Sequence, residues 1–225
     1  MLNVSDTWRQ TFPGAVVGTL VMRNVANPES HAALDQSKKE LENQLRSRFA
    51  EGGRTAIKVL PVIRTYDAHF ARFKKTYPVQ LQLESVALKG KSIPRAVALV
   101  EAMFMAEVKN LLLTAGHDWA AVQPPLRLDA ATGSEQYVLI NGQEQATKPG
   151  DMLMADAQGV ISSVIYGPDQ RTRITAATRQ VLFVVYAPAG IGEQAVRQHL
   201  EDIRANVALV APEATVESLD AYVTG

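Results

Sequence analysis

The sequence MLMADAQGVISSVI, at residues 152–165, decides the fold class. Two short apolar runs, Met152–Ala155 and Val160–Ile165, flank the polar stretch Asp156–Gly159, which is the pattern of two strands joined by a hairpin. Further short runs of this kind lie at residues 126–130, 136–140 and 181–186. The part of the chain that follows Leu126 is therefore predicted to form a sheet.

Upstream of this stretch the patterns are mainly helical. A β-branched run predicts a strand over residues 16–25, and the apolar spacing that follows predicts a helix reaching about Phe49. For the middle third we expect helices over residues 65–75, 79–89 and 95–114, the last closed by Ala115-Gly116.

A last amphipathic helix is predicted from Glu193 to about Asn206, because its apolar residues recur at helical spacing on one face. Helices and strands segregate along the sequence without a βαβ rhythm. The predicted class is α+β, with a helical middle segment packed on a mixed or barrel-like sheet and a C-terminal amphipathic helix.

Composition limits the class of protein. The chain has 225 residues, 47% of them hydrophobic, which predicts one compact domain over residues 1–225. It has no cysteine, so disulfides, thiolate catalysis and cysteine-ligated metals are excluded. The longest apolar stretch, Val97–Val108, is interrupted by Glu101 and Glu107, and Met1–Phe12 is too polar for a signal peptide. We therefore expect a cytoplasmic protein, without membrane contact, metal or cofactor.

The net charge of 0 hides a strong asymmetry. Residues 54–95 carry nine bases against two acids, a net charge of +7, whereas the segment from Glu193 onward is acidic. A local basic surface is what contact with nucleic-acid phosphates requires, although solvated helix faces give the same pattern. The residues predicted to contact RNA are Arg64, Arg72, Lys74, Lys75, Lys89, Lys91 and Arg95.

The familiar catalytic signatures are absent: the sequence has no phosphate-binding loop, dinucleotide fingerprint, zinc-protease motif or nucleophile elbow. The four histidines are scattered, and His199 adjoins the apolar stripe of the last predicted helix. His199 is therefore expected to be a packed residue.

Three segments between Arg64 and Pro188 resemble stand-alone proteins built like the third and fourth domains of the β subunit of bacterial phenylalanyl-tRNA synthetase. The first is an aromatic and basic stretch, Arg64–Pro78, and the second runs from Ala98 to Asp118. The third and most specific is Pro149–Thr178, which contains Gly167-Pro168 and the run Arg171-Thr-Arg-Ile-Thr175. Those domains are tRNA-binding and editing modules.

The resemblance implies a domain that holds the aminoacylated end of a tRNA and, in the synthetase, removes wrongly attached tyrosine. Hydrolysis of that ester needs a positioned water and donors for the developing oxyanion. The residues expected to supply ligand contacts are Gly167, Pro168, Arg171, Thr172, Arg173 and Thr175. Of the two arginines, Arg171 is expected to brace the turn, which leaves Arg173 for the ligand.

Several residues of the family's site are replaced. The editing glutamate falls at Val184 or Val185 and the histidine at Ala115, while Phe104 replaces an asparagine and Pro168 a glycine. His117 and Asp118 are the substitute candidates for catalysis, in a loop that we expect to face Gly167–Thr175 across a pocket.

Two functions stay open. One is hydrolysis of mischarged aminoacyl-tRNA in trans, and the other is non-catalytic binding of tRNA or of a free amino acid or similar small molecule. A third alternative, a protein-interaction domain, has no positive support in the sequence. Nothing in the sequence points to DNA.

Overall fold

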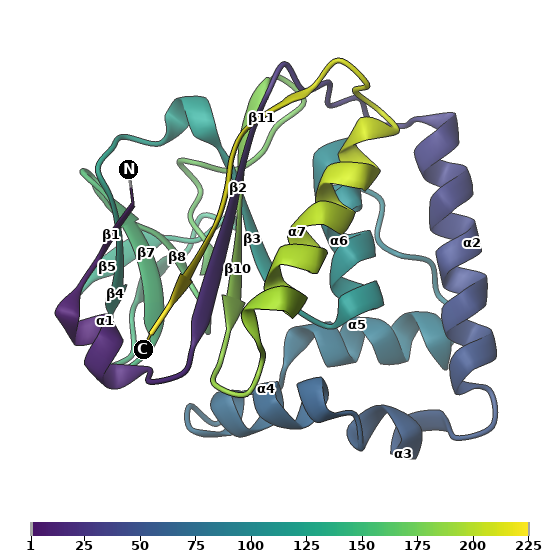
Figure 1. Ribbon diagram of the computed structural model, residues 1–225, viewed down its shortest axis with the longest axis horizontal. Coiled ribbons are helices and arrows are strands. Elements are labelled where there is room, and N and C mark those ends of the chain that lie inside the picture. Colours follow the sequence, from purple (N-terminus) through teal and green to yellow (C-terminus); the bar gives the residue numbers. More distant parts are fainter. Residues whose placement is uncertain (1, 225) are drawn as a thin grey trace.

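The computed structural model describes residues 2–224. It confirms the α+β class: helices α2 to α7 form one side of the molecule and two sheets the other, with α1 on the side of the sheets (Figure 1). The helices are α1 (Asp6–Thr11), α2 (Ala32–Phe49), α3 (Gly53–Lys58), α4 (Pro61–Ala71), α5 (Pro78–Ala87), α6 (Ala98–Asn110) and α7 (Glu193–Ala208), with a short 3-10 turn η1 (Trp119–Ala121).

The strands form three sheets, and the two large ones are open, so the sheet is not a closed barrel. The four-stranded sheet has the order β11 (Thr215–Val223), β2 (Val16–Arg23), β10 (Gln180–Ala187), β3 (Leu113–Asp118) and is antiparallel throughout. The five-stranded sheet has the order β1 (Leu2–Val4), β4 (Leu126–Ala130), β7 (Met152–Asp156), β8 (Gly159–Ser163), β9 (Gly167–Pro168). A separate ribbon pairs β5 (Gln136–Val138) with β6 (Glu144–Ala146).

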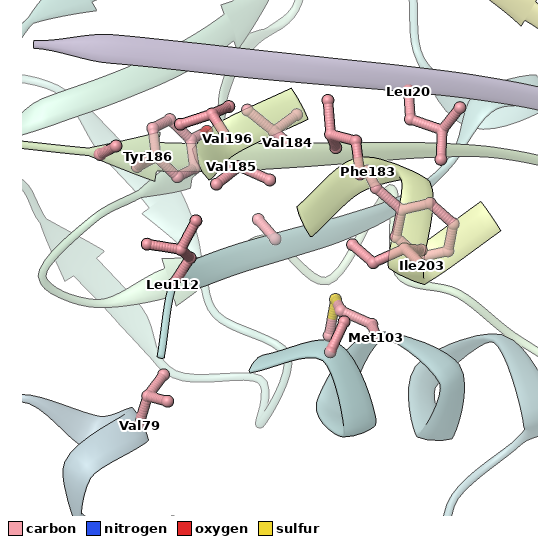
Figure 2. Close-up of a cluster of buried hydrophobic side chains, with 14 of the residues drawn as sticks. Leu20, Val79, Met103, Leu112, Phe183, Val184, Val185, Tyr186, Val196 and Ile203 are labelled. Carbon is pink, nitrogen blue, oxygen red and sulfur yellow. The ribbon is translucent and has the colours of Figure 1, made fainter. Parts of the chain in front are cut away.

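The core is centred on β10, which pairs with β2 and β3 and is buried from Val181 to Ala187. Such a continuous apolar run is expected of a strand covered on both faces. Figure 2 shows side chains from β10, α6 and α7 gathered there, among them Phe183, Met103 and Ile203. Helix α7 lies so close to β2 that a Cβ on Gly18 would come within 2.4 Å of Val196 Cγ1. The glycine is therefore required by the packing.

The predicted helix over residues 95–114 is wrong at its end. Helix α6 stops at Asn110 because Leu111 takes a left-handed conformation, φ 63°, and its carbonyl accepts a hydrogen bond from the Tyr77 hydroxyl at 2.8 Å. The chain then enters β3, so Ala115-Gly116 lies within a strand and does not close a helix.

The predicted C-terminal helix is confirmed as α7, but the strand β11 that follows it was not predicted. β11 is an edge strand, mostly exposed or half-buried, with a register shift between Val216 and Ser218. Its polar composition is typical of an edge. Within residues 2–224, no helix has the length and apolarity needed to cross a membrane.

Candidate functional site

The second and third segments of the resemblance lie side by side. The Asp118 amide donates to the Thr172 carbonyl at 2.7 Å, and His117 and Arg173 form a β-bridge. The prediction that His117 and Asp118 lie in a loop is wrong, because they end strand β3. In the stretch Gly167–Thr175, also expected to be a loop, Gly167-Pro168 forms the short strand β9 and residues 170–175 lie outside regular elements. The structure therefore joins the two segments directly, by backbone hydrogen bonds.

His117 is completely buried, which corrects its proposed catalytic role. The Thr172 hydroxyl donates to Asp169, so it accepts from His117 Nδ1 at 2.8 Å, and His117 Nε2 is buried without a partner. Burial, and after it the charge of Arg171, lowers the pKa of His117 to about 3. Thr172 is equally inaccessible, so its hydroxyl orders Asp169 and His117 and is not available to a ligand.

Arg171 braces the turn, as predicted from its position. Its Nη2 lies 2.8 Å from Asp156 Oδ1, and its Nη1 donates to the Ala121 carbonyl at 3.0 Å. The Asp156 side chain is 0% exposed, whereas that of Arg171 is 32% exposed. Arg171 therefore neutralises a buried carboxylate and ties η1 to the end of β7.

Arg173 is exposed, and its guanidinium makes one hydrogen bond, from Nη1 to the Gln170 carbonyl at 3.2 Å. It lines a cavity of about 520 Å³, here called the Arg173 cavity, together with Asp118, Arg171 and Thr175. Both carboxylate oxygens of Asp118 are engaged, by the Ala120 amide at 3.0 Å and the Thr178 hydroxyl at 2.8 Å. Arg173 is thus the freer of the predicted ligand groups.

The two arginines should respond differently to alanine. Arg171→Ala leaves Asp156 buried without its partner and is expected to lower the free energy of unfolding by about 2 kcal/mol. Arg173→Ala is expected to change it by less than about 0.5 kcal/mol, because the side chain is exposed. Urea denaturation of both variants measures this, and equal losses would contradict the assignment of Arg171 as the structural residue.

A second cavity, of about 280 Å³, lies between the two large sheets and is here called the inter-sheet cavity. Its wall consists of three residues of β3, the turn from β8 into β9, Tyr186 and the first residue of α5. The lining residues are Pro78, Leu113, Thr114, Ala115, Ser163, Val164, Ile165, Tyr166, Gly167, Pro168 and Tyr186. The predicted ligand residues are therefore divided: Gly167 and Pro168 line this cavity, and Arg171, Arg173 and Thr175 line the other.

Hydroxyl groups order the wall of the inter-sheet cavity. The Ser163 hydroxyl donates to Asp151, which is completely buried, and the Tyr137 hydroxyl donates to the Gly167 carbonyl at 2.9 Å. Burial raises the pKa of Asp151 to about 6, against the opposing effect of the Ser163 hydrogen bond. The Tyr66 hydroxyl donates to the Tyr186 carbonyl at 2.6 Å and accepts from the Leu113 amide at 3.1 Å. The Tyr66 hydroxyl therefore joins α4 to β10 and β3.

The positions matched to the family's glutamate and histidine are neighbours in the sheet. Val184 on β10 is directly paired with Ala115 on β3, so their side chains share one face, whereas Val185 is paired with Thr114. Val184 and Ala115 are both buried.

All seven residues predicted to contact RNA are exposed, but they lie in two places. Arg64 and Arg72 belong to α4 and its end, and Lys74-Lys75 form the turn that follows. Lys89, Lys91 and Arg95 lie on the segment beside α2. Arg46 of α2 donates to the Lys91 carbonyl at 3.2 Å, and Arg95 lies 3.5 Å from Asp35 of the same helix. Asp35 and Arg46 are about 16 Å apart along that helix.

One member of the first group reaches the inter-sheet cavity. Lys74 takes a left-handed conformation, φ 57°, which ends α4 and redirects the chain. The Lys75 ammonium then lies 5.0 Å from the centroid of the Tyr166 ring, and Tyr166 lines the cavity. A positive charge is thus held beside an apolar cavity.

Most residues in the wall of the inter-sheet cavity were not predicted from the sequence. Ser163, Tyr166 and Tyr186 have no motif of their own, and only the position of Tyr166 directly before Gly167 could have drawn attention to it. In the described part of the chain, no group of three or more His, Cys, Asp or Glu residues is arranged to hold a metal ion.

A family model described as the B3/4 domain matches residues 68–207. No curated protein sequence was found to match. Among solved structures, the chain is similar to an N-terminal fragment of the phenylalanyl-tRNA synthetase beta subunit from Pyrococcus horikoshii, with 13% identity and a TM-score of 0.49. The alignment covers 98% of this chain and 53% of that one, so this chain spans about half the length of the fragment.

Proposed function

Because this chain belongs to the B3/4 domain family, we propose that it binds the aminoacylated end of a tRNA and seats the amino-acid side chain in the inter-sheet cavity. The cavity, at about 280 Å³, is lined mainly by apolar and aromatic side chains. Ligand sites of this kind combine an apolar lining with a few placed polar groups.

The observation that carries the proposal is the position of Lys75. Its ammonium lies 5.0 Å from the centroid of the Tyr166 ring, beside the cavity, where a nucleotide phosphate can be neutralised. Lys74, the neighbouring residue, is also exposed and basic. The arrangement provides an apolar cavity for a side chain and charge for the phosphates of the terminal nucleotides.

We favour binding over hydrolysis by protein side chains. Within residues 2–224, no imidazole or carboxylate lines the inter-sheet cavity, and Ala115 and Val184 occupy the positions matched to the family's editing residues. General acid or base catalysis needs a titratable group within reach of the reacting atoms.

Lys75→Ala is expected to weaken tRNA binding about 5-fold at low salt, because one phosphate contact is lost. The slope of log affinity against log salt should fall in magnitude by about 1. Filter binding across a salt series measures both. Lys89→Ala is the matched control, since Lys89 is exposed but lies beside α2, and it should have no effect.

Equal effects of Lys75→Ala and Lys89→Ala, or an affinity independent of salt, would contradict the proposed contact. A second measurement compares uncharged tRNA with tRNAs carrying different amino acids and follows loss of the ester bond. Tighter binding of charged tRNA with an intact ester supports the proposal. Rapid loss of one amino acid would instead establish the deacylase.

A further inference from the structure

A third cavity, of about 300 Å³, lies on another face of α4 and is not part of the candidate site. It is an open cavity lined by the turn that leads into β2, by α4 with its last turn, and by the turn that follows β10. Helix α4 contributes Thr65, Ala68, His69 and Arg72, whose spacing of three, one and three residues places them on one stripe. We call it the His69 cavity.

Among the residues that line the cavity, mostly apolar ones, Arg72 carries a positive charge. Phe12, Pro13 and Pro188 are among the apolar residues that line it. Arg72 is exposed, and within residues 2–224 its guanidinium forms no ion pair or hydrogen bond; it lies 5.6 Å from the centroid of the Phe73 ring and close to Gly150. An arginine in this setting has all its donors available for a carboxylate.

His69 adds unused hydrogen-bonding capacity. His69 is 6% exposed, and its ring packs among the rings of Phe12, Phe70 and Phe73. Its Nε2 has no hydrogen-bond partner among the described residues. Burial, followed by the charge of Arg72, lowers the pKa of His69 to about 4. The imidazole is therefore neutral at pH 7, and Arg72 supplies the charge of this cavity.

We propose that the His69 cavity binds a small organic carboxylate, with the carboxylate on Arg72 and the apolar part between Phe12, Pro13 and Pro188. A planar guanidinium matches a carboxylate in a bidentate arrangement, and the volume is near the lower end for ligand pockets. The site is independent of the proposed tRNA contact at Lys75.

The same observations assign Arg72 to the proposed carboxylate site, although the sequence made it a candidate for RNA binding. Arg72 lies on the stripe that contains His69, whereas Tyr66 of the same helix hydrogen-bonds the wall of the inter-sheet cavity. A nucleic-acid phosphate would use the charge of Arg72 but not the apolar cavity beside it.

Phenylacetate is a suitable probe, because it has one ring and one carboxylate. Titration of the full chain at pH 7.5 should shift the His69 ring resonances in NMR spectra in a saturable manner. The neutral analogue phenylacetamide should bind at least 10-fold more weakly. Arg72→Gln should weaken phenylacetate binding at least 10-fold, and Arg64→Gln, on the same helix but outside the cavity, should leave it unchanged.

Three results would overturn the inference. One is the absence of a saturable His69 shift, and another is equal binding of phenylacetate and its amide. The third is a loss of tRNA affinity in Arg72→Gln as large as in Lys75→Ala, which would assign Arg72 to the RNA surface. Failure of the tRNA measurement with Lys75→Ala leaves the carboxylate titration unaffected, so the two proposals fail separately.

Discussion

Replacing Glu107 with glutamine is expected to stabilise the protein at pH 8.5 by about 3 kcal/mol more than at pH 5.5. Glu107 lies on α6, is 2% exposed and accepts a hydrogen bond from the Thr114 amide at 2.8 Å. Burial raises the pKa of this carboxyl from 4.5 to about 8, and the Thr114 hydrogen bond opposes the rise only in part. Glutamine keeps the acceptor and removes the charge.

The sign follows from the proton that the folded state retains. Between pH 4.5 and about pH 8, Glu107 is protonated in the folded chain and ionised in the unfolded chain. Its contribution to stability is therefore fully present below pH 4.5 and is lost as the pH rises through about 8. Urea denaturation of wild type and Glu107→Gln at the two pH values measures the difference.

A difference between two pH values cancels any fixed cost of the new amide group in Glu107→Gln. Glu144→Gln is the matched control, because Glu144 is exposed and should give the same small change at both pH values. A Glu107→Gln effect that is independent of pH would show that the wild-type carboxyl is already ionised in the folded state.

Acid should destabilise the protein through its buried histidines. Replacing His117 with asparagine is therefore expected to raise the free energy of unfolding by about 3 kcal/mol more at pH 4.5 than at pH 7.5. Burial lowers the pKa of His117 and of His199 to about 3, and that of His69 to about 4. Each contributes stability above pH 6.5 that is lost as the pH falls towards the folded value. Asparagine can keep the hydrogen bond to Thr172 without binding a proton.

The measurement is the slope of unfolding free energy against pH between 4.5 and 6.5. Asp151 and Glu107 shift in the opposite direction and offset part of the wild-type loss, so the comparison is made between variants. The slope for His117→Asn should be flatter by about 1.4 kcal/mol per pH unit. Parallel curves would mean that His117 is solvated or charged in the folded protein.

The sequence predicted the elements whose apolar residues recur with a clear period. It did not predict the boundary that depends on the backbone conformation of a single residue. Helix α7 and the strands β7 and β8 follow their apolar patterns. The apolar run after α6 suits helix and strand alike, and the boundary is set by the left-handed Leu111, for which leucine gives no local signal. The edge strand β11 has too little burial to leave an alternating pattern.

The candidate site was less predictable than the fold. The resemblance located Gly167-Pro168 and the Arg171–Thr175 run, but it could not tell that they face different cavities. His117 next to Asp118 suggested chemistry, whereas the strand places the imidazole in the core. Sequence spacing does not report which face of a strand is buried when both faces are covered.

The direct pairing of Ala115 with Val184 also constrains evolution. Glutamate at position 184 alone would bury an unpaired carboxylate, because Val184 is 0% exposed. Position 115 differs, because Ala115 lines the inter-sheet cavity of about 280 Å³, which leaves space for a larger side chain. Since the two positions are directly paired, histidine at position 115 would lie beside glutamate at position 184 and could pair with it. The order in which the two positions are changed therefore decides whether the intermediate chain folds well, and histidine at position 115 is expected to be tolerated first.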